Sequence, residues 1–435
     1  MLGAIVGDIV GSRFEFDNHK SKDFALFAQK CRFTDDRVMT LAVAKAVMEA
    51  AGSKPPGAQG YGDAFYGAMS ALTVQYMREI GQKYPDCGYG GMFRRWMFSA
   101  DPKPYGSYGN GAAMRVSAAG FAATGEGEAE RLAETVTEVT HNHGEGIKGA
   151  QATAAAIVLA RQGALKSGIR ERISARYYPL DFRVDDIRGA YRFDETCQGT
   201  VPQAIACFLE SSSFEDAIRT AVSLGGDSDT LAAITGAIAE AYYGVPEDIR
   251  EKALGYLDGE LRAVYDAWER FAPPNPERFR VLTKYIGKIG AASSPGEWIV
   301  DRENDGTPER PRQMPFVNYS PLVLEFLREL YEFSGSHPEY GLAQYQDILE
   351  QKGLKPGGVI QCPEHPDALD AQAALALVMA AARTDRFCEG TLLGLLEDGS
   401  LTAWLERLKD IDRTRQGREA ADAPPGSHPV PPDSI

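Results

Sequence analysis

Two short acidic segments of the chain place oxygen-bearing side chains directly in front of strongly helical runs. One is Thr34, Asp35 and Asp36 in FTDDRVMT, and the other is GGDSDT at residues 225–230. Thr and Asp are favoured at helix N-caps, and Asp in the first turn complements the helix dipole. Either segment alone could therefore be only a cap. Together they supply four carboxylates and two hydroxyls, which is the same ligand set offered twice.

The second segment also has the features of a turn that faces a ligand. Asp227 and Asp229 are two residues apart with Thr230 next, and Gly225 and Gly226 permit close approach of the backbone. If the two helix starts face each other, their four carboxylates repel strongly unless cations lie between them. Ligation by oxygen alone favours Mg²⁺ or Mn²⁺ over zinc or copper. Two such sites sharing a carboxylate would form a binuclear centre.

The composition limits the partners that the chain can have. Of 435 residues, 46 are Lys or Arg and 61 are Asp or Glu, which gives a net charge of −15. This charge argues against broad nucleic-acid or anionic-membrane binding, but it leaves room for a small anionic ligand at a local site. No run of 18 apolar residues occurs, so we expect no membrane span.

The cysteines are scattered. Six of them, at positions 31, 87, 197, 207, 362 and 388, form no C-x-x-C pair. In a long acidic chain this pattern indicates reduced thiols and a cytoplasmic location. Cys362 and His365 make a single C-x-x-H without a second pair at zinc-finger spacing, so a zinc site is not expected.

Apolar residues recur at helical spacing through most of the chain, whereas clean period-two alternation is scarce. The clearest helical runs cover residues 38–51, 150–162, 200–211 and 230–244. Many of them are rich in Ala and Gly, whose small size lets helices pack closely around a shared centre. We therefore predict an all-α protein.

Changes in composition predict four segments. Residues 1–272 are expected to form one compact helical domain, and 316–412 a second, smaller one. The stretch 273–315, rich in Pro, Gly and charge, is expected to be a linker with one short helix. The tail 413–435 has few apolar residues and is expected to be disordered. ARTDRFCEG and TAWLERLKDI look similar to a small helical domain of unknown function in bacterial proteins, which could stabilise the chain or recognise a partner.

Five motifs in a fixed order resemble the ADP-ribosylglycohydrolases, a family that includes relatives of the dinitrogenase-reductase-activating glycohydrolase. They are GAIVGDIVGSRFE (3–15), FTDD (33–36), YGSYGNGAAMR (105–115), THNHGEGIKGA (140–150) and GGDSDT (225–230). The resemblance implies an all-α, orthogonally packed domain with a binuclear Mg²⁺ or Mn²⁺ centre. It also implies hydrolysis of the N- or O-glycosidic bond between ADP-ribose and an acceptor, which could be a protein, a nucleic acid or a small molecule. ADP-ribose would be the product.

The resemblance also assigns roles to individual residues. Metal ligands would be Thr34, Asp35 and Asp36 from one side and Asp227, Asp229 and Thr230 from the other. Glu15 would lie near the metals and the scissile ribose, so that Glu15, Asp35 or Asp36 would be the catalytic carboxylate. The diphosphate and ribose would be contacted by Ser107, Tyr108, Gly109 and Asn110, with His141 beside the ligand. A glycine-rich loop suits that role because it exposes backbone N–H donors. Asp8 would support the site from behind the ligands.

One departure from the family pattern supports an alternative function. The family segment usually reads T-D-D-T, but Arg37 stands in the fourth position here. An arginine beside two carboxylates could pair with them and compete with a cation, or it could point outward and leave the site unaffected. The alternative is therefore a catalytically impaired module that still binds ADP-ribose. A helical phosphohydrolase of the His-Asp type is disfavoured because no histidine is followed by Asp, and the clustered acids argue against a purely structural role.

Overall fold

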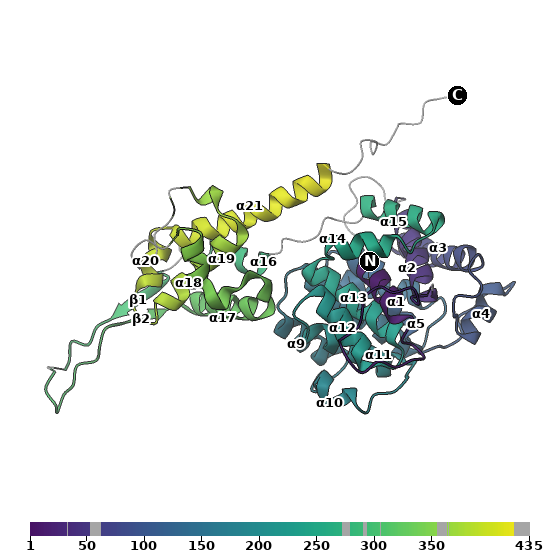
Figure 1. The fold of residues 1–435 in the computed structure, drawn as a ribbon, viewed down its shortest axis with the longest axis horizontal. Coiled ribbons are helices and arrows are strands. Elements are labelled where there is room, and N and C mark those ends of the chain that lie inside the picture. The colour runs from purple at the N-terminus through teal and green to yellow at the C-terminus, as the bar shows by residue number, and fades with distance from the viewer. Residues whose placement is uncertain are drawn as a thin grey trace, which may run out of the picture. The chain divides into compact units, whose positions relative to one another are not determined.

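Helices dominate the chain, as the sequence predicts. The computed structural model describes residues 1–32, 34–52, 62–271, 279–289, 294–304, 306–354, 363 and 365–421. It divides into two compact units, Met1–Pro276 and Glu277–Ile435 (Figure 1). The described parts of both units consist mainly of helices, with two short strands in the second. The all-α fold class is confirmed. No helix among the described residues is long and apolar enough to span a membrane.

Fifteen helices make up the described part of the first unit. They are α1 (Leu2–Gly11), α2 (Asp35–Gly52), α3 (Asp63–Gly81), α4 (Gly91–Phe98), α5 (Gly111–Met114), α6 (Ser117–Ala122), α7 (Glu126–Thr137), α8 (Gly144–Arg161), α9 (Lys166–Arg176), α10 (Val184–Arg188), α11 (Cys197–Leu209), α12 (Phe214–Leu224), α13 (Ser228–Tyr243), α14 (Glu247–Leu254) and α15 (Gly259–Phe271). The runs predicted at 38–51 and 230–244 fall on α2 and α13. Gly244, with φ of 75°, ends α13.

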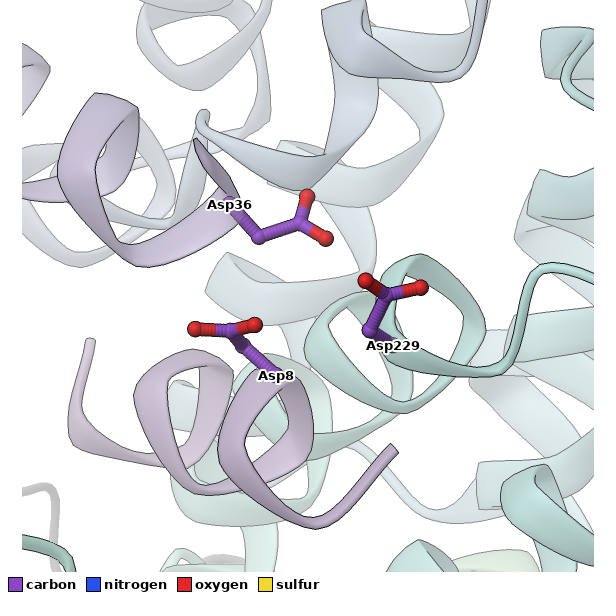
Figure 2. Close-up of side chains that lie close together, drawn as sticks. All are labelled: Asp8, Asp36 and Asp229. Carbon is purple, nitrogen blue, oxygen red and sulfur yellow. The ribbon is translucent and has the colours of Figure 1, made fainter. Parts of the chain in front are cut away.

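Helices α1 and α13 pack against each other through glycines spaced four residues apart. A Cβ built on Gly3 would lie 2.0 Å from the carbonyl oxygen of Gly236, and one on Gly7 would lie 2.0 Å from that of Ala232. Since real Cβ atoms do not approach so closely, only glycine permits this helix separation. The contact sets Asp8 of α1 and Asp229 of α13 near each other (Figure 2). The Ala- and Gly-rich runs in the sequence therefore do pack closely.

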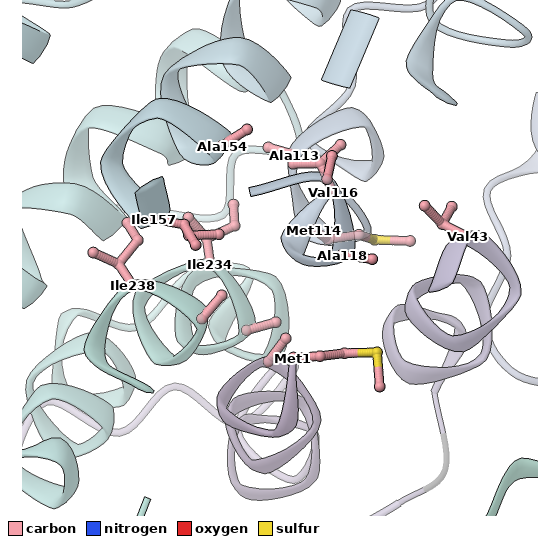
Figure 3. Packing of buried hydrophobic residues seen from close by; sticks show 14 of the residues in the cluster. Met1, Val43, Ala113, Met114, Val116, Ala118, Ala154, Ile157, Ile234 and Ile238 are labelled. Carbon is pink, nitrogen blue, oxygen red and sulfur yellow. The ribbon is translucent and has the colours of Figure 1, made fainter. Parts of the chain in front are cut away.

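Helix α13 also runs through the hydrophobic core of this unit. Its Ile234 and Ile238 are buried and lie beside Ile157 of α8, which is also buried (Figure 3). Almost every residue of α13 is buried from Ser228 to Ala239. A helix that is apolar on all sides belongs at the centre of a domain. The carboxylates at its start are therefore held on a rigid support.

The second unit is a smaller group of helices with one antiparallel β-hairpin. Its elements are α16 (Arg280–Thr283), β1 (Gly296–Ile299), β2 (Phe316–Tyr319), α17 (Pro321–Ser336), the 3-10 turns η1 (Pro338–Tyr340), η2 (Leu342–Gln344) and η3 (Pro366–Ala368), α18 (Tyr345–Gln351), α19 (Ala371–Thr384), α20 (Thr391–Glu397) and α21 (Ser400–Ala421). Strand β1 pairs with β2 with Trp298 opposite Val317. Gly399 separates α20 from α21 with φ of 82°.

The structure differs from the predicted linker and tail. In the described part of 273–315, the backbone N–H of Phe279 donates to Asp412 at 2.9 Å, and the hydroxyl of Tyr285 donates to Glu329 at 2.9 Å. Phe279 and Tyr285 are buried, so this segment belongs to the packed second unit. The linker prediction was wrong for these residues because it relied on the content of Pro, Gly and charge. That content does not reveal that Phe279 and Tyr285 pack into the second unit. Helix α21 continues to Ala421, beyond the predicted boundary at 412, and residues 422–435 lie outside the described residues, as does Cys362 of the C-x-x-H pair.

Candidate metal centre and pocket

Three helices bring one carboxylate each to a common point. They are Asp8 of α1, Asp36 at the start of α2 and Asp229 at the start of α13. One oxygen from each lies within 4.8 Å of the others, and the three side chains point toward one another (Figure 2). All three residues are buried. The two helix starts that the sequence singled out therefore face each other, with α1 as a third contributor.

A second group of carboxylates lies next to the first. Glu15, Asp227 and Asp229 also have one oxygen each within 4.8 Å of one another. Asp229 is common to both groups, so we call them the Asp8 triad and the Glu15 triad. Two triads that share a carboxylate have the composition of a binuclear site with one bridging ligand. Asp35 belongs to neither triad among the described residues, although it lies in the wall of the same pocket.

Several polar side chains of these segments bond to groups on other elements. Asp227 occupies the N-cap of α13, yet its side chain makes no capping hydrogen bond. Its Oδ2 accepts a hydrogen bond from Nδ2 of Asn110 at 2.7 Å. The hydroxyl of Thr230 donates to Asp36 at 3.0 Å, and the hydroxyl of Thr34 donates to Asp8. The simple cap interpretation therefore does not describe the second segment.

Arg37 has a different partner from the one that the sequence suggested. Its Nε donates to Oδ2 of Asp8 at 2.6 Å, and one of its terminal nitrogens donates to the carbonyl oxygen of Arg32. The sequence left open whether Arg37 pairs with Asp35 and Asp36 or points outward. The structure shows a buried side chain that pairs with Asp8. Helix α1 presents Asp8 to the guanidinium, which the spacing along the chain could not reveal. Asp8 is thus both a member of a triad and the partner of a buried cation.

Burial and mutual repulsion raise the pKa values of these acids. Burial, together with the charge of Asp227, raises the pKa of Glu15 to about 7. Burial also raises the pKa of Asp35 to about 7. The pKa values of Asp36 and Asp229 lie well above the usual range, because both are buried and each has another aspartate as its next strongest influence. Carboxyls crowded into one buried site cannot all ionise without a compensating charge.

The donor set fits divalent cations that prefer oxygen. The residues that could hold them are Asp8, Glu15, Asp36, Asp227 and Asp229, joined by the hydroxyls of Thr34 and Thr230. Neither triad contains a nitrogen or sulfur ligand. Hard cations such as Mg²⁺ and Mn²⁺ match such a set. Arg37 pairs with Asp8, so the ion pair that the structure shows engages one carboxylate of this set.

All members of the two triads except Asp8 line a pocket of about 660 Å³. It is lined by nearly all the site residues that the sequence predicted, namely Glu15, Asp35, Asp36, Ser107, Tyr108, Gly109, Asn110, His141, Asp227, Asp229 and Thr230. Thr34 is the exception, because it is buried and bonded to Asp8. A pocket of this size accommodates a ligand as large as a dinucleotide fragment.

The predicted diphosphate loop is held by its backbone. The N–H of Asn110 donates to the carbonyl of Glu195 at 2.8 Å, and the N–H of Cys197 donates to the carbonyl of Tyr108 at 2.9 Å. The N–H of Gly106 donates to Oδ1 of Asn142 at 2.7 Å. These bonds fix the loop between the start of α11 and the segment before α8. Asn110 also connects the loop to the metal centre through Asp227.

Several pocket residues were missed by the sequence analysis. A second glycine-rich segment, Gly88 to Gly91, lines the pocket in front of α4, and Arg115 and Phe193 line it elsewhere. The run CGYGG at 87–91 was a visible cue, because clustered glycines often expose backbone to a ligand. Arg115 lay inside a motif that was recognised, but its burial could not be read from the sequence.

Comparison with known proteins identifies the family. The sequence model described as ADP-ribosylglycohydrolase matches residues 1–276, which is more than half of the chain. The chain belongs to the ADP-ribosylglycohydrolase family. It is therefore a hydrolase of the class that removes ADP-ribose. A second model, described as a family of unknown function (DUF6508), matches residues 274–414.

Curated relatives of this ADP-ribosylglycohydrolase agree with that assignment. ADP-ribosylhydrolase ARH3 of Homo sapiens is 27% identical over 348 residues, which cover 60% of this chain and 90% of that protein. ADP-ribosylarginine hydrolase Tri1 of Pseudomonas putida is 30% identical over 281 residues, covering 56% and 70%. ADP-ribosyl-[dinitrogen reductase] glycohydrolase of Rhodospirillum rubrum is 30% identical over 192 residues, covering 40% and 61%. A solved structure titled ADP-ribosylglycohydrolase-related protein complex matches 62% of this chain and 97% of its own, with 23% identity and a TM-score of 0.44.

Proposed function

We propose that the chain is a metal-dependent hydrolase that uses two Mg²⁺ or Mn²⁺ ions to cleave the glycosidic bond between ADP-ribose and an acceptor. The observation that carries this proposal is the pair of acidic triads that share Asp229 in the wall of one pocket. When bound there, the ions would polarise the ribose hydroxyls and lower the pKa of bound water. Hydrolysis of glycosides passes through a positively charged transition state, which clustered carboxylates stabilise.

The residues around the triads would hold them in place. Nδ2 of Asn110 donates to Asp227 and also to Oγ1 of Thr200 at 3.1 Å, which fixes the Asp227 carboxylate. The Thr230 hydroxyl bonds to Asp36 across the centre. Because a hydroxyl that donates to a carboxylate keeps its lone pairs free, Thr34 and Thr230 can offer oxygen to a cation at the same time. These bonds preorganise the carboxylates before a ligand arrives.

The loop of Ser107 to Asn110 would bind the diphosphate, and the acids would face the ribose. The loop and the triads, apart from Asp8, line the same pocket and are joined by the Asn110–Asp227 hydrogen bond. A ligand with an anionic centre and a polyhydroxylated end fits that order of groups. Tyr108 is 47% exposed, so its ring is available to the rest of the ligand.

Glu15 is the carboxylate that we propose as the proton acceptor. It is partly exposed, whereas the other members of both triads are buried. Its partial exposure lets water and substrate reach it, which a proton acceptor needs. Asp35 is also partly exposed and lines the pocket, but it belongs to neither triad among the described residues. Replacing each by its amide separates the two: Glu15→Gln should abolish turnover, and Asp35→Asn should reduce it less.

The acceptor is proposed to be a protein side chain. Two relatives are named for an ADP-ribosylated arginine and for ADP-ribosylated dinitrogen reductase. Acceptors on a nucleic acid or a small molecule stay within the prediction. The cytoplasmic location also stays a prediction from the cysteine pattern.

Release of ADP-ribose tests the proposed function. Peptides carrying ADP-ribose on arginine or on serine are incubated with the protein and Mg²⁺, and the products are separated by chromatography. We expect release that stops with EDTA, returns with Mg²⁺ or Mn²⁺, and is lost in Asp229→Asn. Asp248→Asn, on an exposed carboxylate of α14, is the matched control and should keep full activity. Absence of release from every acceptor would contradict the proposal.

The alternative function is an ADP-ribose-binding module without turnover, favoured by Arg37. The pairing of Arg37 with Asp8 engages one carboxylate of the Asp8 triad. In that case ADP-ribose should raise the melting temperature of the wild-type protein by mass action, no substrate should be cleaved, and Arg37→Thr should restore cleavage.

A further inference from the structure

Arg115 is a buried cation in the wall of the pocket. It is 1% exposed, and it follows α5 in the motif GNGAAMR. Its terminal Nη2 donates to Oγ1 of Thr140 at 2.5 Å and lies 3.2 Å from Nδ1 of His141. Its Nε has no hydrogen-bond partner among the described residues. A buried charge normally has an opposite charge in contact, so a guanidinium held only by neutral groups needs an explanation.

The contacts of Arg115 decide which nitrogen of His141 carries the proton. A guanidinium only donates hydrogen bonds, so the Nδ1 atom that it approaches must be an acceptor. The hydroxyl of Thr140, which accepts from Arg115, lies 2.8 Å from the same Nδ1 and can donate to it. Both neighbours therefore place a lone pair on Nδ1. In a neutral imidazole the proton is then on Nε2.

The Nε2 atom faces the glycine-rich loop of the pocket. A Cβ built on Gly109 would lie 3.6 Å from Nε2, and one built on Gly111 would lie 3.5 Å from it. Since neither residue has a side chain, this edge of the ring stays open to the pocket that His141 lines. An Nε2–H donor on this edge of the pocket is placed for an anionic ligand such as a diphosphate.

We propose that Arg115 is a positioning residue that fixes His141 as a neutral Nε2–H donor aimed at the anion subsite of the pocket. The proposal rests on the proposed function only for the identity of the ligand, ADP-ribose. Arg115 acts through His141 and adds a positive charge behind the subsite, without touching the ligand itself. The protein thus gains a directed donor whose protonation state does not change near neutral pH.

The surroundings of the ring agree with this role. The charged or titratable groups that face it are Arg115 and Tyr105, whose ring centroid lies 5.9 Å from that of His141. The neighbouring residues of α7 and α8, Thr137 and Gly146, do not titrate. Burial, and then the charge of Arg115, lower the pKa of His141 well below its usual range. Burial also lowers the pKa of Arg115 to about 10, so the guanidinium stays charged at neutral pH.

Nitrogen NMR of the wild-type protein tests the tautomer directly. The protein is labelled with ¹⁵N-histidine, and the His141 signals are assigned by their loss in His141→Gln. We expect Nδ1 to be unprotonated and Nε2 protonated, with no change between pH 5.5 and 8. A ring protonated on Nδ1, or one that titrates in this range, would overturn the proposal. This measurement needs no variant of Arg115 and no ligand.

Variants then test whether Arg115 is the cause. Arg115→Met keeps the length of the side chain but removes its charge and its donor, so the pKa of His141 should rise from its depressed value, while burial still holds it below its ordinary range. The affinity for ADP-ribose, relative to wild type at the same pH, should fall about tenfold at pH 8, the usual effect of losing one charge-assisted hydrogen bond. The deficit should shrink as the pH is lowered, because the raised pKa of His141 lets more of the ring become a cation. Comparing both proteins at each pH cancels the effect of the pocket carboxylates.

Two further variants complete the test. Arg115→Lys keeps a charge and a donor and should restore the wild-type pH profile, and it serves also if Arg115→Met does not fold. Arg95→Met, on an exposed cation of the same pocket, should leave the His141 signals unchanged. A loss of affinity by the same factor at every pH would indicate a structural role and overturn the proposal. Normal His141 signals in a wild-type protein that does not bind ADP-ribose would overturn the proposed function but support the positioning role.

Discussion

Arg37 and Asp8 form a buried ion pair at the Asp8 triad. Nε of Arg37 lies 2.6 Å from Oδ2 of Asp8, and the two side chains are 1% and 0% exposed. The pair joins the first turn of α2 to α1. It also means that the departure of Arg37 from the family pattern gives Asp8 a buried cation as its partner.

Removing the guanidinium should destabilise the protein in the absence of metal. Arg37→Met leaves Asp8 buried without its partner, so the free energy of unfolding should fall by about 3 kcal/mol. Urea unfolding in EDTA measures it. Arg262→Met breaks the exposed pair with Asp266 on α15 and should cost less than about 1 kcal/mol. Adding Asp8→Asn to Arg37→Met should recover part of the loss. An equal loss of unfolding free energy in Arg37→Met and Arg262→Met would contradict the expectation that the buried ion pair stabilises the protein more than the exposed one.

The stability of the metal-free protein should fall as the pH rises. Burial raises the pKa values of Glu15 and Asp35 to about 7, above their unfolded values of 4.5 and 3.8. Each group therefore binds its proton more tightly when the chain is folded. The stabilisation of the folded state that each carboxyl contributes is therefore fully present below its unfolded pKa, and it is lost as the pH rises through 7.

Unfolding curves in EDTA between pH 5 and 8 measure this slope. Asp35→Asn should reduce it, and saturating Mg²⁺ should flatten it, because a bound cation replaces the protons. A metal-free protein whose stability rises over this range would contradict the assigned pKa shifts.

The glycine contact between α1 and α13 should be essential for both stability and metal binding. Gly7→Ala places a Cβ about 2.0 Å from the carbonyl of Ala232, so the helices must separate, at a cost of about 1–3 kcal/mol. Since these helices carry Asp8 and Asp229, the stabilisation by Mg²⁺ should fall as well. Gly67→Ala in α3 meets no atom within 4 Å and should stabilise the protein slightly. The melting temperatures of both variants are measured with and without Mg²⁺. Equal melting temperatures, and an equal rise with Mg²⁺, would argue against a tight contact between α1 and α13.

The sequence predicted much of this site because its residues are local. Asp227 and Asp229 lie two residues apart at a helix start, and Asp35 and Asp36 stand together at another. Such spacing indicates ligands without any knowledge of the fold. Periodicity likewise located α2, α11 and α13 to within three residues at each end, and it located α8 without its first six residues. Spacing alone did not show that the two segments face each other. The family resemblance implied that they do.

The contributions that depend on tertiary packing could not be predicted. Asp8 enters a triad, and meets Arg37, only because glycines let α1 approach α13. Arg115 reaches His141 across 26 positions of sequence, a contact that no local pattern reveals. Phe279 and Tyr285 looked like parts of a linker until their partners in the second unit, Asp412 and Glu329, were placed. In each case the partner lies on another element.

Counting bound ions is the most direct test of whether the two acidic triads that share Asp229 hold two cations. Mn²⁺ is titrated calorimetrically into protein stripped with EDTA. We expect two bound ions in the wild type and in the surface control Asp248→Asn. We expect one bound ion in Asp227→Asn, which loses only the Glu15 triad, and none in Asp229→Asn, which loses both triads. A single ion in the wild type, or two ions bound with unchanged affinity by Asp229→Asn, would contradict this expectation.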